Sequence, residues 1–220
     1  MFWGMVGDSE GCGLRQEGRT LRQVPLPWPC QNGPTRVSPP LPQHTMTTIT
    51  FTLADPHTHR ADLLRLSKEY MDWVLGELSA LTGASPEAMM GMPVATYVES
   101  TLDKVCGELP PVGAFYLVHA DGVLAGMGGL RRVEDGVGEV KRIYVRPDQR
   151  GKRLGEAIMQ RVLADAADFG YARMLLDSAP FMQSAHRLYE NMGFQYRSAY
   201  EPTEVPPQFH AIWRFMERGQ

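Results

Sequence analysis

The sequence predicts a mixed α/β fold of the α+β type, with a largely antiparallel central sheet flanked by helices. Apolar residues recur every three or four positions in some stretches and alternate in others, which is typical of helices and strands respectively. Asp-Gly turns join three consecutive strand-like runs. A later strand-helix-strand unit favours parallel pairing of its two strands. The expected order of elements is βααβββαβαββ.

The folded domain is expected to span residues 46–220. Residues 1–45 are rich in proline and show no helical or alternating apolar period. Such a segment lacks the apolar surface that offsets the entropy of ordering. It is therefore predicted to be a disordered arm, or upstream sequence included by a misplaced start codon. A PxxP ligand is the sharper alternative, but the proline pattern is too common to support it.

A first strand and two helices open the domain. Residues 48–53 alternate as a strand, and Asp55-Pro56 then leads into a long helix that stops at Gly83. A second helix is predicted over 94–109, where a proline pair ends it.

The remaining elements are a three-stranded meander followed by alternating helices and strands. Turns with Asp-Gly separate the strands of the meander. A helix, a strand, a second helix and two final strands complete the chain. The predicted ranges are strands 114–119, 123–133 and 139–146, helix 152–169, strand 172–177, helix 180–192, and strands 194–200 and 209–216.

Composition excludes several classes of protein. The 22 basic and 25 acidic residues give a net charge of −3, so nothing favours a nucleic-acid or anionic-membrane partner. Three cysteines without a CxxC pair encode neither a disulfide framework nor a structural zinc site. The sequence has no apolar run of membrane-spanning length and no signal-peptide pattern at its start, so we expect a cytoplasmic protein.

The loop after the meander carries the strongest chemical signal. Residues 150–155, RGKRLG, place two glycines and three cations where a helix begins. Free N–H groups of a first helical turn bind phosphates, and glycine lets the backbone approach them closely. Neither a Walker loop nor a GxGxxG dinucleotide pattern is present, so nucleotide hydrolysis and NAD binding are not expected.

Two motifs connect this loop with a known family. The strand before it ends in the triplet Ile143-Tyr144-Val145, and residues 185–194 read AHRLYENMGF. The GNAT superfamily of acyl-CoA-dependent N-acetyltransferases has an L-x-V-like triplet, then Q/R-x-x-G-x-G/A at a helix start, then A-x-x-L-Y-x-x-x-G-F. The chain therefore resembles this superfamily over residues 46–216.

The resemblance implies transfer of an acetyl group from acetyl-CoA to a primary amine of a small molecule or peptide, without a metal. It implies an oxyanion donor from the strand backbone near Val145, where a bulge splays this strand from the next, and a pantetheine arm paired with the exposed strand edge. The implied cofactor-binding residues are Ile143, Tyr144, Val145, Arg150, Gly151, Lys152, Arg153, Leu154 and Gly155.

Two positions depart from the family pattern. Arg153 replaces a usual glycine, so we expect its backbone to stay in ordinary φ/ψ space, with altered phosphate contacts. Met182, with Gln183 beside it, stands where the family tends to have an asparagine that holds the CoA arm. One cofactor contact is therefore expected to differ.

Tyr189 is the expected general acid and Glu139 the expected general base. The departing thiolate needs an acid whose pKa exceeds about 8.5, and tyrosine, near 10, satisfies this. The alternative for Tyr189 is simple packing of its helix. The acceptor ammonium must lose a proton, and Glu139 lies where some family members place a base. His119 and His186 are the alternatives, His186 on the helix face of Tyr189.

Other polar and sulfur-containing residues have simpler explanations. His57 and His59 stand at a helix entrance, where capping is expected, so we predict no metal site there. Residues 89–92, MMGM, suggest an adaptable apolar lid, in a region that lines the acceptor site in the family. Three acidic residues of the first helix could attract a cationic amine or could simply be solvated: Glu69, Asp72 and Glu77.

The main functional hypothesis is an N-acetyltransferase that works as a monomer or a homodimer. Two alternatives belong to other classes: a non-catalytic acyl-CoA-binding module that regulates a partner, and a plain α/β interaction domain without a CoA site. Thermal stabilisation by CoA separates the last of these from the others.

Overall fold

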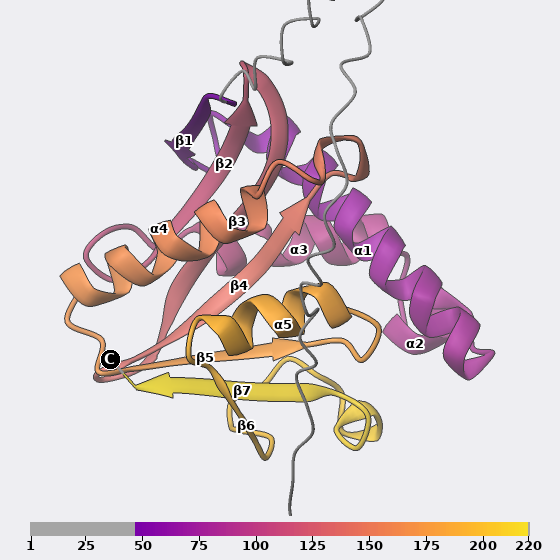
Figure 1. Cartoon of the computed structure of the whole chain (residues 1–220). Coiled ribbons are helices and arrows are strands. Elements are labelled where there is room, and N and C mark those ends of the chain that lie inside the picture. The colour runs from indigo at the N-terminus through magenta and orange to yellow at the C-terminus, as the bar shows by residue number, and fades with distance from the viewer. Residues whose placement is uncertain (1–46, 220) are drawn as a thin grey trace, which may run out of the picture. The chain divides into compact units, whose positions relative to one another are not determined.

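A computed structural model describes residues 47–219 (Figure 1). The predicted proline-rich arm, residues 1–45, lies outside the described residues. The elements are β1 (Ile49–Leu53), α1 (Arg60–Thr82), α2 (Pro86–Met90), α3 (Val94–Cys106), β2 (Ala114–Ala120), β3 (Val123–Glu134), β4 (Val137–Val145), a 3-10 turn (Pro147–Gln149), α4 (Leu154–Asp168), β5 (Arg173–Ser178), α5 (Gln183–Asn191), β6 (Gln195–Arg197), a second 3-10 turn (Pro207–Phe209) and β7 (Arg214–Gly219).

The predicted fold class is confirmed, with differences at individual elements. The short helix α2 is absent from the predicted order, because one turn is too short to show an apolar period; the Ser85 side chain caps it. Helix α1 begins at Arg60, since Asp55 Oδ1 accepts backbone hydrogen bonds from His57 and Thr58 and thereby forms a turn. Strand β7 starts later than predicted, after the second 3-10 turn.

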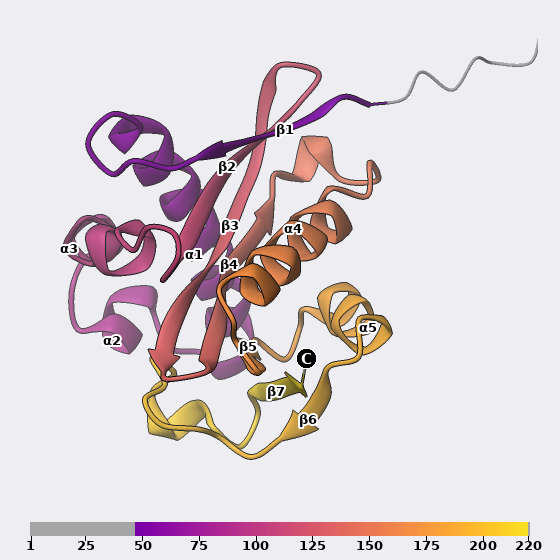
Figure 2. The same cartoon turned by 90° about the vertical axis from the view of Figure 1, so that its left-hand side faces the viewer.

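Seven strands form one sheet in the order β1-β2-β3-β4-β5-β7-β6. Strands β4 and β5 pair in parallel, and all other neighbours are antiparallel. Helices α1, α2 and α3 lie on one side of the sheet, and α4 and α5 lie on the other (Figure 2). The connection from β4 through α4 to β5 is the predicted crossover.

Two apolar layers hold the sheet between its helices. On the α4 side, Ile158 and Met159 are fully buried against the strands, and on the α1 side Leu63, Leu66 and Met127 are fully buried. Each such side chain contributes roughly 1.5–3 kcal/mol through burial. This packing fixes the positions of β4 and β5, which border the candidate site.

Strands β4 and β5 pair only at one end. Their register covers residues 137–139 of β4 and 173–175 of β5 and then stops. Further along β4 the pairing with β3 shifts opposite Gly128, and Arg142 has a positive φ of 49°, which together mark a β-bulge. The two strands diverge beyond the paired end, and β4 rises away from β5 in Figure 1. The sheet therefore has a V-shaped opening between them.

Candidate active site

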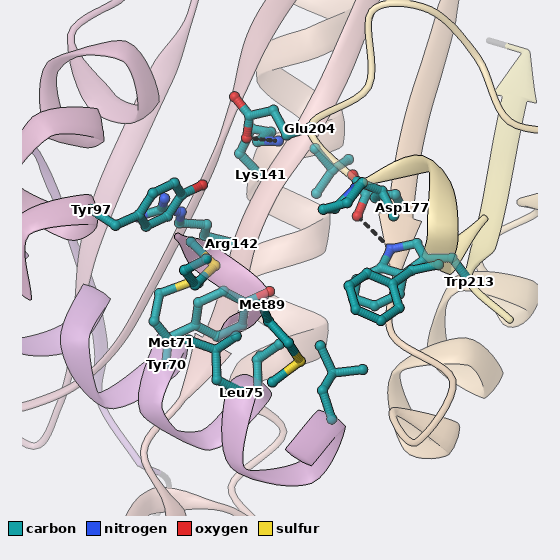
Figure 3. A pocket seen from close by; sticks show the side chains of 17 residues that line it. Tyr70, Met71, Leu75, Met89, Tyr97, Lys141, Arg142, Asp177, Glu204 and Trp213 are labelled. Carbon is teal, nitrogen blue, oxygen red and sulfur yellow. Dashed lines mark hydrogen bonds and ion pairs between the residues drawn. The ribbon is translucent and has the colours of Figure 1, made fainter. Parts of the chain in front are cut away.

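A cavity of about 320 Å³ lies beside the opening between β4 and β5 (Figure 3). Apolar side chains of α1 and α2 form much of its wall, and the segment from Glu204 to Trp213 closes the β5 side. Met89 and Met90, from the segment predicted to be an adaptable lid, line it. Its polar side chains are Tyr70, Tyr97, Lys141, Arg142, Asp177, Glu204 and Trp213. A cavity of this size and mixed polarity suits a small organic molecule.

Asp177 presents a carboxylate to this cavity from the end of β5. Trp213 Nε1–H donates to Asp177 Oδ1 at 2.8 Å. Within the described residues, this is the one hydrogen bond that the Asp177 side chain makes. Burial raises the pKa of Asp177, and the nearby Lys141 opposes the rise without cancelling it. A carboxylate with a raised pKa and spare lone pairs can accept a proton from a bound amine.

A network of ion pairs lies next to Asp177, between β3, β4 and the loop after β6. Glu139, 0% exposed, accepts from Arg131 Nε at 2.8 Å and from the Tyr200 hydroxyl at 2.7 Å. Lys141 Nζ lies 3.0 Å from Glu204 Oε2 and 3.6 Å from Glu139 Oε2. Both oxygens of Glu139 are thus already occupied, and Glu139 does not line the cavity.

Glu204 is held by three cations. Its carboxylate lies 2.9 Å from Lys104 Nζ and 3.0 Å from both Arg131 Nη1 and Lys141 Nζ. Burial raises the pKa of Glu204, but these ion pairs outweigh it and hold that pKa well below its usual range. Glu204 is therefore a permanent anion rather than a base.

Arg142 is positioned by the bulge of β4 and faces the cavity. Its Nη2 lies 3.4 Å from Thr101 Oγ1, a long contact with a neutral group. Its Nη1 is buried and has no hydrogen-bond partner in the described part of the chain. A buried guanidinium nitrogen without an acceptor is energetically unfavourable, and a ligand that accepts its hydrogen bond would relieve this cost.

Tyr189 lies in α5 and is not among the residues that line the cavity. Its side chain packs against Phe194, with ring centroids 6.2 Å apart, and is 6% exposed. Burial raises the pKa of Tyr189, and the nearby Tyr70 and Asp177 raise it further. No residue from 47 to 219 hydrogen bonds with its hydroxyl group, which leaves this O–H free to donate to a ligand.

The loop between β4 and α4 has the geometry of an anion-binding site. Gly151 and Arg153 both have a left-handed backbone, with φ of 83° and 57°. Within the described residues, no backbone N–H from residue 151 to residue 156 donates a hydrogen bond. Successive free N–H groups at the positive end of a helix attract phosphates.

The expectation that Arg153 keeps ordinary φ/ψ angles is wrong. The turn into α4 requires a left-handed residue at this position, where glycine costs least. A residue other than glycine pays roughly 1–2 kcal/mol there. Two hydrogen bonds from the Arg153 guanidinium to Glu156, at 2.7 and 2.9 Å, help to hold it.

With this geometry established, comparison with known proteins identifies the family. Residues 88–194 match the sequence model of the acetyltransferase (GNAT) family, and the fold has the splayed parallel pair, the anion loop and the tyrosine in the expected order. The chain belongs to the GNAT family.

The sequence matches between this GNAT chain and its relatives extend over only part of each chain. It is 35% identical over 68 residues to an uncharacterised N-acetyltransferase of Schizosaccharomyces pombe, which is 31% of this chain and 42% of that protein. It is 30% identical over 105 residues to the IAA acetyltransferase of Azospirillum brasilense, which is 47% of this chain and 66% of that protein. The chain thus spans less than two thirds of these relatives.

The GNAT fold is also found in solved structures. The PaiA N-acetyltransferase of Thermoplasma acidophilum, crystallised in complex with coenzyme A, superimposes with a TM-score of 0.53 at 15% identity. The match covers 79% of this chain and 99% of that one. At this identity the similarity establishes the fold.

The predicted cofactor residues of the GNAT domain gather along β4 and the loop after it. Tyr144 is buried and contacts Trp73 of α1, with ring centroids 6.4 Å apart, while Ile143 and Val145 are half-buried. Arg150 places its guanidinium 5.3 Å from the centre of the Trp73 ring, and its Nε donates to Val145 O at 3.3 Å. These residues surround the far end of the opening.

The remainder of the loop begins α4. Leu154 is buried beneath the sheet, whereas Gly151, Lys152 and Arg153 are exposed. Lys152 Nζ donates to Gln149 at 2.8 Å, and Gly151 has open space on the side where a side chain would project. An anion could therefore approach the backbone of this turn closely.

The other sequence-predicted candidates fall in different places. His186 is buried with Nε2 at 3.1 Å from Ser178 Oγ, and burial lowers its pKa. His119 lies in β2 opposite β1, so the structure does not bring it to the cavity. Met182, at the start of α5, contacts Ser178 through its sulfur at 3.5 Å.

No potential metal cluster of three or more His, Cys, Asp or Glu residues occurs in residues 47–219, and His57 and His59 lie in the turn before α1. No helix in the same range has the length and apolarity to cross a membrane. Cys106 is a buried free thiol, and Cys12 and Cys30 lie outside the described residues.

Sequence reasoning missed the polar residues of the cavity that the structure brings together. Asp177 was predicted as the last residue of a strand, and a carboxylate in that position could have served as a signal. Tyr70, Arg142 and Glu204 gave none, because they meet only through the packing of α1, β4 and the loop after β6. Trp213, just before β7, lies 36 residues after Asp177 in the chain and donates its indole N–H to the Asp177 carboxylate.

Proposed function

We propose that this GNAT protein is an N-acetyltransferase that uses acetyl-CoA to acetylate a primary amine by direct attack. One arrangement carries the proposal: β4 and β5 diverge beside a polar cavity lined by residues of both strands, a loop of free N–H groups follows β4, and the Tyr189 hydroxyl has no hydrogen-bond partner among the described residues. The family and the relatives named as acetyltransferases support the same activity.

The loop residues fit the phosphates of CoA. The N–H groups from residue 151 to residue 156 supply donors, and Gly151 and Gly155 present no side chain to an approaching phosphate. Beyond residue 139, the β5 side of β4 has no strand partner among the described residues, so its backbone can pair with the amides of an extended pantetheine arm. Bound acetyl-CoA supplies an activated thioester; the chain orients it.

Two side chains handle the protons. Asp177 takes a proton from the acceptor ammonium, so that the neutral nitrogen forms a bond to the thioester carbonyl carbon. The β4 backbone near its bulge donates to the oxygen that becomes negative. As the carbon–sulfur bond breaks, Tyr189 gives its proton to the thiolate of CoA, and the second proton that the attacking nitrogen loses on becoming an amide passes to the tyrosinate and restores it. Tyr189 is thus proposed as the acid that the sequence predicted.

For the base, we propose Asp177 in preference to the sequence candidate Glu139. Asp177 lines the cavity and has one donor, Trp213, whereas the Glu139 carboxylate is closed off by Arg131 and Tyr200. A base must reach the proton that it removes. Replacing each carboxylate in turn separates the two assignments, as described in the Discussion.

The test is release of CoA thiol from acetyl-CoA in the presence of pooled primary amines, with the acetylated product identified by mass spectrometry. Tyr189→Phe should lower kcat at least about tenfold, the lower range of general-acid effects. Tyr196→Phe is the matched control, because its exposed hydroxyl contacts only Glu190. Full activity in Tyr189→Phe would remove Tyr189 from the mechanism. Tight acetyl-CoA binding without turnover of any amine would instead indicate the regulatory module.

A further inference from the structure

Arg142 has two unusual features, and the proposed transfer reaction uses only the backbone one. Among the buried side-chain nitrogen and oxygen atoms of residues 47–219, Arg142 Nη1 is the one without a hydrogen-bond partner. Its backbone is held at a positive φ of 49°. Strained backbone and unpaired buried charge persist at sites where a ligand makes use of them.

No carboxylate in residues 47–219 forms an ion pair with Arg142. Glu204 is shared by Lys104, Arg131 and Lys141, and Glu139 is bound by Arg131 and Lys141. These two carboxylates therefore face three cations before Arg142 is counted. The β4 wall of the cavity is positive, while Asp177 presents a carboxylate from β5 (Figure 3).

Apolar side chains form much of the remaining wall of the cavity. Met71, Leu75 and Met89 face it from α1 and α2, and Phe209 and Trp213 face it from the opposite segment. The volume of about 320 Å³ suits a single amino acid with a large side chain better than a polypeptide. Tyr70 also lines the cavity; burial raises the pKa of Tyr70, Asp177 raises it further and Arg142 opposes the rise.

We propose that the acceptor is a free amino acid with a large apolar side chain, whose α-carboxylate is bound by Arg142 while its amine faces Asp177. This inference rests on the proposed acetyltransferase activity. A planar guanidinium binds a carboxylate with two parallel hydrogen bonds, which would satisfy Nη1. The apolar wall then holds the side chain, and the opposite charges of the two walls match the zwitterion.

Three acceptors that differ only at the carboxylate test this proposal: L-phenylalanine, L-phenylalaninamide and phenethylamine. With acetyl-CoA, kcat/KM for L-phenylalanine should exceed that for either analogue by about 10- to 100-fold, the range expected of a charge-assisted contact. Equal rates, or a preference for the amide, would overturn the inference while leaving the acetyltransferase activity established. A preference for the amide would point to peptide N-termini.

Substitution at Arg142 gives the second arm. Arg142→Asn removes the guanidinium but tolerates a left-handed backbone, so it should lower the preference for L-phenylalanine over phenethylamine at least about tenfold. Arg142→Lys should recover part of it. Arg173→Asn, on an exposed pair with Glu134, is the matched control and should keep the wild-type preference. An unchanged preference in Arg142→Asn would remove Arg142 from acceptor binding.

A ligand without an amine tests the carboxylate site even if no amine is acetylated. 3-Phenylpropanoate has the same ring and carboxylate, so it should raise the melting temperature of the wild type but not of Arg142→Asn. Failure of all acceptors together with this shift would reject the proposed function and retain the carboxylate site. Absence of the shift from the wild type, or an equal shift in both proteins, would overturn the inference.

Discussion

The two ends of the opening between β4 and β5 differ in whether their polar groups have hydrogen-bond partners. At the paired end, residues 137–139 hydrogen bond with β5, and the Glu139 carboxylate is enclosed by Arg131 and Tyr200. At the splayed end, described residues leave Arg142 Nη1, the Tyr189 hydroxyl and the N–H groups of the loop after β4 without partners. Buried polar groups are normally paired, so the difference indicates where ligands complete the structure.

The largest effect should come from Asp177→Asn. Loss of the base should lower kcat by about 10²- to 10⁴-fold. Stability should move the other way. Because burial raises the pKa of Asp177 above its ordinary value, the ionised carboxylate destabilises the folded state increasingly as the pH rises from that ordinary value to the folded pKa, and fully above it. Asparagine carries no such charge and can still accept from Trp213.

The measurement is kcat together with the melting temperature at pH 8, for the wild type and for Asp177→Asn. A variant that is both more stable and nearly inactive would indicate that Asp177 serves the reaction at a cost in stability, as expected of a residue at the splayed end. A variant that keeps wild-type kcat would exclude it as the base.

Glu139→Gln tests the paired end, with an intermediate effect. Glutamine keeps the shape but removes the charge that faces Arg131, so the free energy of unfolding should fall by about 1–3 kcal/mol. We expect kcat to stay within about threefold of the wild type, because this carboxylate does not line the cavity. Urea unfolding and steady-state kinetics provide the two measurements. A loss of kcat as large as that in Asp177→Asn would restore Glu139 as the base.

The sequence was sufficient for features that depend on local pattern. The strands of the meander follow from Asp-Gly turns, and the anion loop follows from glycines and cations at a helix start. Tyr189 was singled out by its motif, and it lies buried in α5; its role as the acid stays a prediction. These signals lie within short stretches of chain, where spacing determines geometry.

The pairing of charges could not be predicted, because it depends on contacts between distant segments. Glu139 was expected to act as a base at a strand start, yet Tyr200 and Arg131 reach it through tertiary packing and bury it. The left-handed backbone of Arg153 has a similar origin: the turn requires it even though arginine disfavours it. Tertiary structure overrides local preference at both positions.

Gly155→Ala should have the smallest effect. It tests whether glycine at this position lowers the stability of the protein but favours acetyl-CoA binding. Gly155 lies in the first turn of α4, and a Cβ there would meet Leu188 Cδ2 at 3.7 Å, an ordinary contact. Alanine favours helices over glycine, so the free energy of unfolding should rise by about 0.5–1 kcal/mol without ligand. The added methyl group should at the same time weaken acetyl-CoA binding, because it occupies the space through which phosphates approach the backbone.

Gly76→Ala is the matched control for this last substitution. Gly76 lies within α1, has open space around a Cβ and does not line the cavity, so alanine should stabilise it to a similar extent and leave acetyl-CoA affinity unchanged. Calorimetric titration and urea unfolding of both variants make the comparison. Weaker binding confined to Gly155→Ala would mean that glycine is kept there for the ligand. Equal affinities would mean that the first turn of α4 does not approach the cofactor closely, and the anion loop would then act through residues 151–154 alone.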